Sequence, residues 1–129
     1  MTDHHASCSC RQLRLVAHGE PVRVSMCHCY ACQRRTGSTY GAQARFLTEN
    51  VQITGTSTEY VRLGESGAAV HFHFCPACGA TVYYWFDDSF RAVPVGAFAD
   101  NAFPPPRISV WEERMHPWVS VPEGAEHRA

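Results

Sequence analysis

Seven cysteines in a chain of 129 residues constrain the fold of this protein more than any other feature of its sequence. They fall into three groups, which are Cys8 and Cys10, then Cys27, Cys29 and Cys32, and finally Cys75 and Cys78. In a reducing compartment, clustered cysteines are more often metal ligands or catalytic groups than disulfides. The number is also odd, so complete pairing within the chain would leave one thiol over.

The motif Cys75-Pro76-Ala77-Cys78-Gly79 is the strongest local signal among these groups. A C-x-x-C followed by glycine is the turn of a zinc ribbon, and glycine permits the tight backbone that this turn needs. A structural zinc needs four ligands, so one C-x-x-C supplies only half of them. Cys8 and Cys10 are the unaccompanied pair, and we expect them to complete this site. The resulting metal cross-link would restrict the unfolded chain in the same way as a disulfide.

Cys27, Cys29 and Cys32 then remain as a local group of three sulfurs. Three protein ligands and one open position are typical of a catalytic zinc. The open position can take water or a substrate thiolate, and zinc holds a thiol as its nucleophilic anion at neutral pH. These three cysteines are therefore predicted to form the catalytic centre around a second zinc.

Two other interpretations of this group stay open. A fourth protein ligand from His28, His71 or His73 would close the site and make it purely structural. Alternatively, Cys29 and Cys32 form a redox-active dithiol, although the βαβ pattern expected around such a motif is missing. The remaining histidines are expected to be solvated or satisfied by backbone groups, and they are His4, His5, His18, His116 and His127.

Short stretches of alternating apolar residues, which are typical of half-buried strands, recur along the chain. They predict strands at 13–16, 22–26, 39–46, 51–54, 58–63, 69–74, 81–86, 91–98, 108–111 and 118–121. Pro94 cannot donate to a strand ladder, so 91–98 is expected at an edge or a bulge. The best helical candidate is a turn or two over 30–35. This pattern indicates an all-β fold, a sandwich or distorted barrel of short antiparallel strands with zinc-binding knuckles.

Length and charge exclude several functional classes. The chain fits a single domain, expected over 6–121 with a C-terminal tail over 122–129. Its formal net charge is −1 and its basic residues are scattered apart from Arg34 and Arg35, unlike a nucleic-acid-binding surface. No apolar run approaches the ~18–20 residues of a membrane span, and the N-terminus lacks a signal-peptide core. We therefore expect a cytoplasmic protein, while its oligomeric state stays open.

Three motifs occur in a fixed order along the chain. They are Ser7-Cys8-Ser9-Cys10, the block Cys27-His28-Cys29-Tyr30-Ala31-Cys32-Gln33-Arg34-Arg35-Thr36-Gly37-Ser38, and Phe74-Cys75-Pro76-Ala77-Cys78-Gly79. Together they resemble the glutathione-dependent formaldehyde-activating enzyme family, also called the centromere protein V family, over roughly residues 6–121. The resemblance implies an Mss4-like all-β fold with two zinc sites. It assigns Cys8, Cys10, Cys75 and Cys78 to the structural zinc and Cys27, Cys29 and Cys32 to a second, labile zinc.

The resemblance also implies an activity, the condensation of glutathione with formaldehyde to S-(hydroxymethyl)glutathione, whose reverse is carbon–sulfur lyase chemistry. The expected partner is therefore a small thiol such as glutathione. Because arginine recognises carboxylates with paired hydrogen bonds, Arg34 and Arg35 are candidate substrate-binding residues, with Gln33 and Ser38 as further polar contacts. The alternatives are a non-catalytic zinc module and a sensor of thiols or metals. An enzyme needs a vacant position at the second zinc and a pocket beside it, whereas a structural module needs neither.

Two positions depart from the pattern of this family. Arg11 follows Cys10 where the family usually has glycine. This difference affects the backbone just after the expected metal ligands. Ile108 and Ser109 stand where a family segment often carries a histidine, so no role of such a histidine is carried over to this chain.

Overall fold

The computed structural model describes residues 2–129, and most of its regular elements are strands. The strands are β1 (Asp3–Ser7), β2 (Arg14–His18), β3 (Arg23–Cys27), β4 (Gly41–Leu47), β5 (Val51–Thr54), β6 (Thr58–Leu63), β7 (Ala69–Phe74), β8 (Thr81–Trp85), β9 (Phe90–Pro94), β10 (Ile108–Val110) and β11 (Glu126–His127). One α-helix, α1 (Tyr30–Thr36), and the 3-10 turns η1 (Thr48–Asn50), η2 (Val95–Phe98) and η3 (Glu112–Arg114) accompany them. The all-β prediction is confirmed. Over residues 2–129, no helix is long and apolar enough to cross a membrane.

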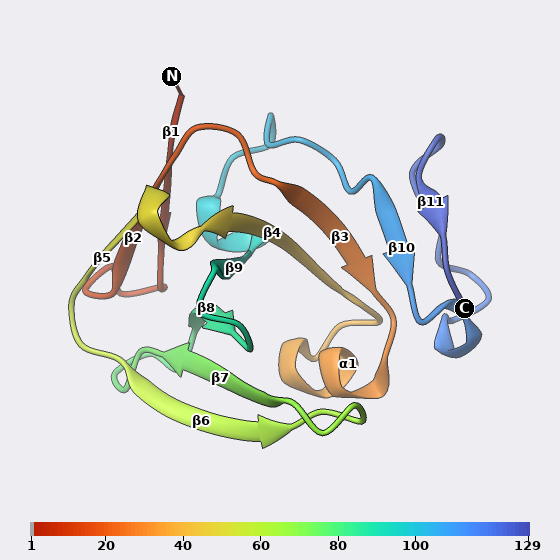
Figure 1. Ribbon diagram of the computed structural model, residues 1–129, viewed down its shortest axis with the longest axis horizontal. Coiled ribbons are helices and arrows are strands. Elements are labelled where there is room, and N and C mark those ends of the chain that lie inside the picture. The colour runs from red at the N-terminus through yellow and green to blue at the C-terminus, as the bar shows by residue number, and fades with distance from the viewer. Residues whose placement is uncertain (1) are drawn as a thin grey trace.

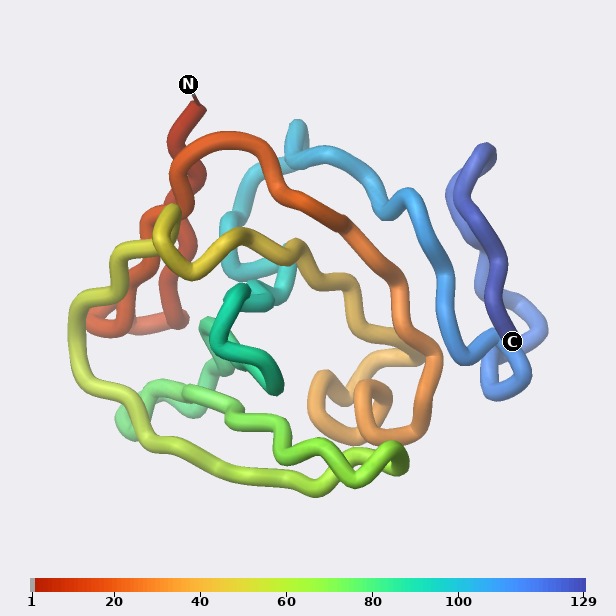
Figure 2. The backbone as a smooth tube through the Cα atoms, in the orientation of Figure 1, coloured from red at the N-terminus to blue at the C-terminus, as the bar shows by residue number. Residues whose placement is uncertain are grey.

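The strands form two sheets that stay open at their edges. The smaller sheet has the order β1-β2-β5, and the larger has the order β11-β10-β3-β4-β9-β8-β7-β6. The larger sheet curves so strongly that the β6–β7 hairpin faces α1, which lies inside the curve (Figure 1). The chain trace shows that the segment from β3 passes through α1 and returns into β4 (Figure 2). The helix that contains Cys32 and is capped by Cys29 is thus placed opposite two neighbouring strands.

The main core is continuous with part of the first cysteine group. Its most deeply buried members come from β2, β4, β8, β9 and the loop before β2, and they include Leu13, Leu15, Ala17, Ala44, Phe46, Val82 and Val93. Cys8 and Cys75 belong to the same cluster, with exposed fractions of 2% and 0%. A substitution at either cysteine therefore disturbs the core as well as a metal site.

His4 is a correction to the expectation of solvated histidines. Its ring packs among Phe46, Phe98 and Phe103, with centroids 5.9, 5.9 and 5.1 Å away. Its Nε2 atom is buried without a hydrogen-bond partner. The ring therefore contributes mainly apolar and aromatic contacts at the margin of the core, although the sequence of β1 is polar.

The strand predicted over 91–98 is wrong in its second half and in its position. The ladder ends at Pro94, and the chain continues as η2. β9 pairs with β4 on one side and β8 on the other, so it is an interior strand. Proline is accommodated because it is the last residue of the strand, where its missing N–H breaks no further bond.

The C-terminal region also differs from expectation. Residues 118–121 form no strand, since Pro117 and Pro122 bracket them and the Val119 amide donates to the His116 carbonyl in a turn. The region expected as a loose tail contains β11, which pairs in parallel with β10. The sequence signal there is weak because β11 has only two residues and its pairing depends on a distant partner.

Candidate metal centres and the adjoining cavity

The four cysteines predicted to share a site come together in the structure. The Sγ atoms of Cys8, Cys10, Cys75 and Cys78 all lie within 4.8 Å of one another. The Cys10 sulfur is 3.6 Å from the sulfurs of both Cys8 and Cys75. A tetrahedral zinc with Zn–S bonds of ~2.3 Å separates its sulfurs by about 3.8 Å. This four-sulfur group therefore has the size and the donor atoms to hold one metal ion.

Two tight turns carry the four-sulfur group. Gly79 adopts a φ of +80°, and its amide donates to the Cys75 carbonyl at 2.8 Å, as the zinc-ribbon turn predicts. Arg11 adopts a φ of +69°, a region that glycine enters freely and other residues enter at a cost of about 1–2 kcal/mol. The departure from the family's glycine therefore leaves the shape of this turn intact and adds local strain.

Gln12 supports the four-sulfur group, although no sequence motif pointed to it. Its Nε2 atom donates to Cys75 Sγ at 3.0 Å and to the Thr56 carbonyl at 2.7 Å, while its Oε1 atom accepts from the Thr56 amide at 2.9 Å. The hydrogen bond from Gln12 lowers the pKa of Cys75 to about 6. The sulfur is thereby favoured as the thiolate that a metal ion requires.

The second group, Cys27, Cys29 and Cys32, also converges, with its sulfurs within 4.8 Å of one another. Cys27 ends β3, and Cys29 caps α1 by accepting the Cys32 amide at 3.3 Å. Hydrogen bonds from Cys27 and Cys32 and, less strongly, the charge of Arg62 hold the pKa of Cys29 well below its usual range. The hydrogen bond with Cys29 raises the pKa of Cys27. One of the three sulfurs is therefore disposed to carry a negative charge.

Among residues 2–129, no histidine, aspartate or glutamate ligand atom joins these three sulfurs. His28 follows Cys27 directly, but its side chain is fully buried and its Nε2 atom lies 2.9 Å from Ser109 Oγ. The histidine beside the ligands thus serves to pack β3 against β10.

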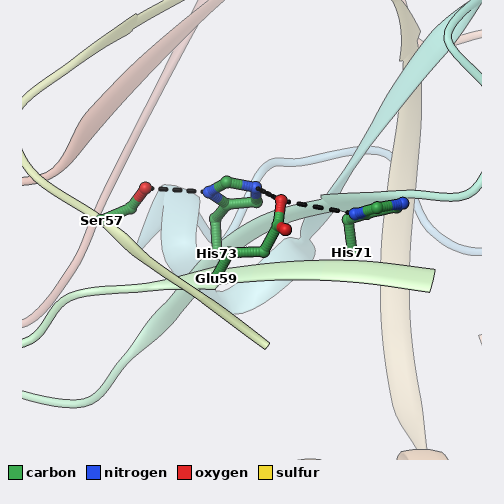
Figure 3. Close-up of polar contacts among 4 residues, drawn as sticks. All are labelled: Ser57, Glu59, His71 and His73. Carbon is green, nitrogen blue, oxygen red and sulfur yellow. Dashed lines mark hydrogen bonds and ion pairs between the residues drawn. The ribbon is translucent and has the colours of Figure 1, made fainter. Parts of the chain in front are cut away.

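His71 and His73 are also unsuited to complete the group. They extend from one face of β7 toward Glu59, which lies between them (Figure 3). Glu59 Oε2 is 3.3 Å from His71 Nδ1 and 3.0 Å from His73 Nε2, and Ser57 Oγ is 2.8 Å from His73 Nδ1. The interpretation of a site closed by His28, His71 or His73 is therefore wrong for this arrangement of side chains.

The Ser109–His28 contact gives a first testable expectation. In a Ser109→Ala variant the buried imidazole nitrogen would lose its partner, which should lower the unfolding free energy by about 1–3 kcal/mol. Urea denaturation measures this change. Ser38→Ala is the matched control, because Ser38 is exposed and its hydroxyl makes no hydrogen bond, so it should change stability by less than about 0.5 kcal/mol. Equal effects of the two variants would contradict the structural role of Ser109.

A cavity of about 550 Å³ adjoins the second cysteine group. Its lining comes from α1, β6, β7, the turn after Cys78 and the start of β8, and consists of Ala31, Arg34, Arg35, Tyr60, Arg62, Phe72, Phe74, Gly79 and Thr81. No cysteine lines this cavity, but Ala31 directly precedes Cys32 and Gly79 directly follows Cys78. A Cβ atom added to Gly41 would stand 3.1 Å from Arg35 Nη2 and 3.4 Å from Cys32 Cβ, so the base of the Cys32 side chain lies near Arg35.

The cavity is strongly cationic. Arg35 and Arg62 both lie over Phe72, with Cζ atoms 5.7 and 5.2 Å from the ring centre, and Arg35 also lies 5.1 Å from the centre of Tyr84. Arg35 Nη2 and Arg62 Nε are buried without a hydrogen-bond partner. Within residues 2–129, neither these arginines nor Arg34 forms an ion pair with a carboxylate. Arg34, Arg35 and Arg62 thus give the cavity a positive charge that favours an anionic ligand.

The predicted substrate-binding residues divide between two places. Arg35 lines the cavity, Gln33 and Ser38 border a different hollow beside Trp118, and Arg34 borders both. The Gln33 amide is fully engaged, because Nε2 donates to the carbonyls of His28 and Arg114 and Oε1 lies 2.9 Å from His116 Nε2.

The cavity residues that sequence reasoning missed come from β6 and β7. Tyr60 and Arg62 alternate on one face of β6, and Phe72 and Phe74 alternate on one face of β7. Because side chains alternate along a strand, the predicted strands already place each of these pairs on a common face. Nothing in the sequence indicated that these faces lie opposite α1.

Comparisons with known proteins agree with this geometry. The family model described as "Glutathione-dependent formaldehyde-activating enzyme" matches residues 3–114. A crystal structure of a Rhodobacter sphaeroides protein, solved as a structural genomics target, is similar in fold, with a TM-score of 0.55 and 15% sequence identity. That likeness covers 78% of this chain and 91% of the other. None of the curated proteins matches the chain significantly.

The family model spans both cysteine groups and the strands that carry them. The resemblance of the three sequence motifs to this family is therefore confirmed. The chain belongs to the glutathione-dependent formaldehyde-activating enzyme family.

Proposed function

We propose that this protein is a zinc-dependent carbon–sulfur lyase that joins a small thiol to an aldehyde, or separates them, beside Cys27, Cys29 and Cys32. Glutathione and formaldehyde are the reactants that the family's name suggests. The observation that carries the proposal is three converging sulfurs without a fourth protein ligand, placed next to a cationic cavity. A purely structural site would be closed and would need no such cavity.

The donor sets of both cysteine groups suit zinc, because thiolate ligands in a tetrahedral arrangement favour this metal. In the four-sulfur group, such an ion would be enclosed by protein ligands and its role would be structural. Bound to Cys27, Cys29 and Cys32, zinc would supply a Lewis-acidic centre that stabilises a thiol as its anion.

The protein's own side chains would bind and orient the reactants. Arg34, Arg35 and Arg62 offer guanidinium donors for the carboxylates of the thiol. Tyr84 lies beneath Arg35 and helps to hold its guanidinium group in position. In the forward direction, a bond forms between the thiol sulfur and the carbonyl carbon, and the thiol proton passes to the carbonyl oxygen. The reverse direction breaks the same carbon–sulfur bond.

A Cys29→Ser variant tests this function. Because thiols and formaldehyde combine readily without a catalyst, the measurement should be the exchange rate between free formaldehyde and its glutathione adduct at equilibrium, observed by nuclear magnetic resonance. The native chain should accelerate exchange, and the variant should lose most of this acceleration, on the order of 100-fold. Metal analysis should show that the variant loses only one of two zinc ions.

The same experiment distinguishes the alternatives. A native chain that binds two zinc ions but leaves the exchange rate unchanged would contradict the enzyme and favour a non-catalytic zinc module. Reversible loss of one zinc ion on addition of glutathione, without acceleration, would favour a sensor of thiols.

A further inference from the structure

The charges lining the cavity are all of one sign. Of the residues that border it, Arg34, Arg35 and Arg62 are charged and the others are neutral, and none is a carboxylate. Arginine stays protonated at any physiological pH, so this positive charge is permanent. Glutathione carries two carboxylates but also a free ammonium group, which such a lining would repel.

Nearby carboxylates do not compensate for this imbalance. Glu59 is next to Tyr60 in β6 but points to the opposite face, where it lies between His71 and His73 (Figure 3). Glu65 forms an ion pair with Arg114 at 3.1 Å. Neither borders the cavity, so its lining offers no anionic partner for an ammonium group.

The positive groups come from two separate elements. Arg34 and Arg35 come from α1, whereas Arg62 comes from β6, and the Cζ atoms of Arg35 and Arg62 lie 5.7 and 5.2 Å from the Phe72 ring centre. Each of these two arginines has a buried nitrogen without a hydrogen-bond partner. Those two nitrogens are closed to a ligand, but both arginines border the cavity, so each element presents a guanidinium group to an anionic acceptor.

From this distribution we infer that the thiol bound here carries at least two separated anionic groups and no free ammonium group. Carboxylate-bearing thiols whose amine is acylated or absent meet this description. The inference rests on the proposed function, because it assigns the substrate class of the same site. Unmodified glutathione is then a weaker ligand than a derivative with a capped amine.

A cobalt-substituted protein provides the test, because cobalt(II) bound by thiolates has a visible spectrum that changes when another thiol coordinates. Three probes are titrated at pH 7, namely glutathione, N-acetylglutathione and N-acetylglutathione dimethyl ester. We expect N-acetylglutathione to bind at least tenfold more tightly than glutathione, and the ester to bind at least tenfold more weakly than N-acetylglutathione. Equal or tighter binding of glutathione overturns the inference.

Arginine variants locate the source of the preference. Arg62→Gln should reduce the preference for N-acetylglutathione over glutathione to within about twofold to threefold, since one of the two cationic positions is lost. Arg34→Gln is the second variant, and it changes an exposed residue of α1, so folding is preserved even if Arg62→Gln is unstable. A preference that survives in both variants contradicts the assignment to this cavity.

The cobalt spectrum distinguishes a wrong substrate class from a wrong proposed function. If all three thiols change the cobalt spectrum with similar affinities, the site binds thiols and only the charge selection is wrong. If no thiol changes the spectrum of the native protein, the proposed function and the inference fall together.

Discussion

A Cys75→Ser variant is expected to lose the metal ion of the four-sulfur group and to unfold at least about 15 °C below the native chain. Metal binding to a structural site contributes directly to folding, because the unfolded chain has no preformed site. Cys75 is also fully buried in the main core and receives a hydrogen bond from Gln12. The substitution therefore removes a ligand and places a hydroxyl group among apolar side chains.

Calorimetry and metal analysis, each with and without a chelator, measure this effect. Cys29→Ser is the matched control, because it removes one sulfur from the second group, which lies at the start of a short helix and outside the main core cluster. We expect this control to lose one metal ion while its unfolding temperature falls by less than about 5 °C. If the two variants were equally destabilised, the division into one structural and one functional site would be wrong.

Gly55→Ala is expected to lower the unfolding free energy by about 3–5 kcal/mol. Gly55 has a φ of +98°, and an added Cβ atom would stand 2.0 Å from the Gln12 carbonyl oxygen and 2.9 Å from Leu13 Cα. These are backbone atoms, so no side-chain rotation can relieve the overlap. The segment that must move contains Gln12, which hydrogen-bonds Cys75, so the affinity of the four-sulfur group for metal should fall as well.

The Gly67→Ala variant separates the effect of steric overlap from the cost of a positive φ angle. Gly67 has a similar φ of +87°, but an added Cβ atom would meet nothing within 4 Å. This control should lose only the free energy of placing alanine in the left-handed region, about 1–2 kcal/mol. Urea denaturation of both variants gives the comparison. Equal losses would mean that the approach of Gly55 to Gln12 contributes nothing to stability.

The parts of the fold that were correctly predicted depend on local signals. The bounds of β5, β6 and β7 agree with the sequence, because β-branched and aromatic residues alternate there and a glycine-rich turn separates β6 from β7. The helix at 30–35 was also correct, since Cys29 caps it locally. By contrast, β11 has no local pattern of its own, and its existence depends on pairing with β10.

In the candidate site, too, local signals were predictive and long-range contacts were missed. Cysteine spacing alone gave both sulfur groups that converge in the structure. Arg62 and Gln12 were missed because their roles depend on contacts with residues far along the chain, which spacing cannot reveal. Gln33 was assigned to the substrate because of its neighbours in the motif, but its amide is used to hold α1 against the segment at 114–116.

The long separation between the two halves of the four-sulfur group has a consequence for biosynthesis. The contacting sulfurs of Cys10 and Cys75 are 65 positions apart in the sequence. A growing polypeptide leaves the ribosome from its N-terminus, so Cys8 and Cys10 emerge with the local group of Cys27, Cys29 and Cys32 long before Cys75 is translated. Any metal ion captured at that moment is held by sulfurs from the first 32 residues alone. The four-sulfur group can therefore be completed only after Cys78 has been translated.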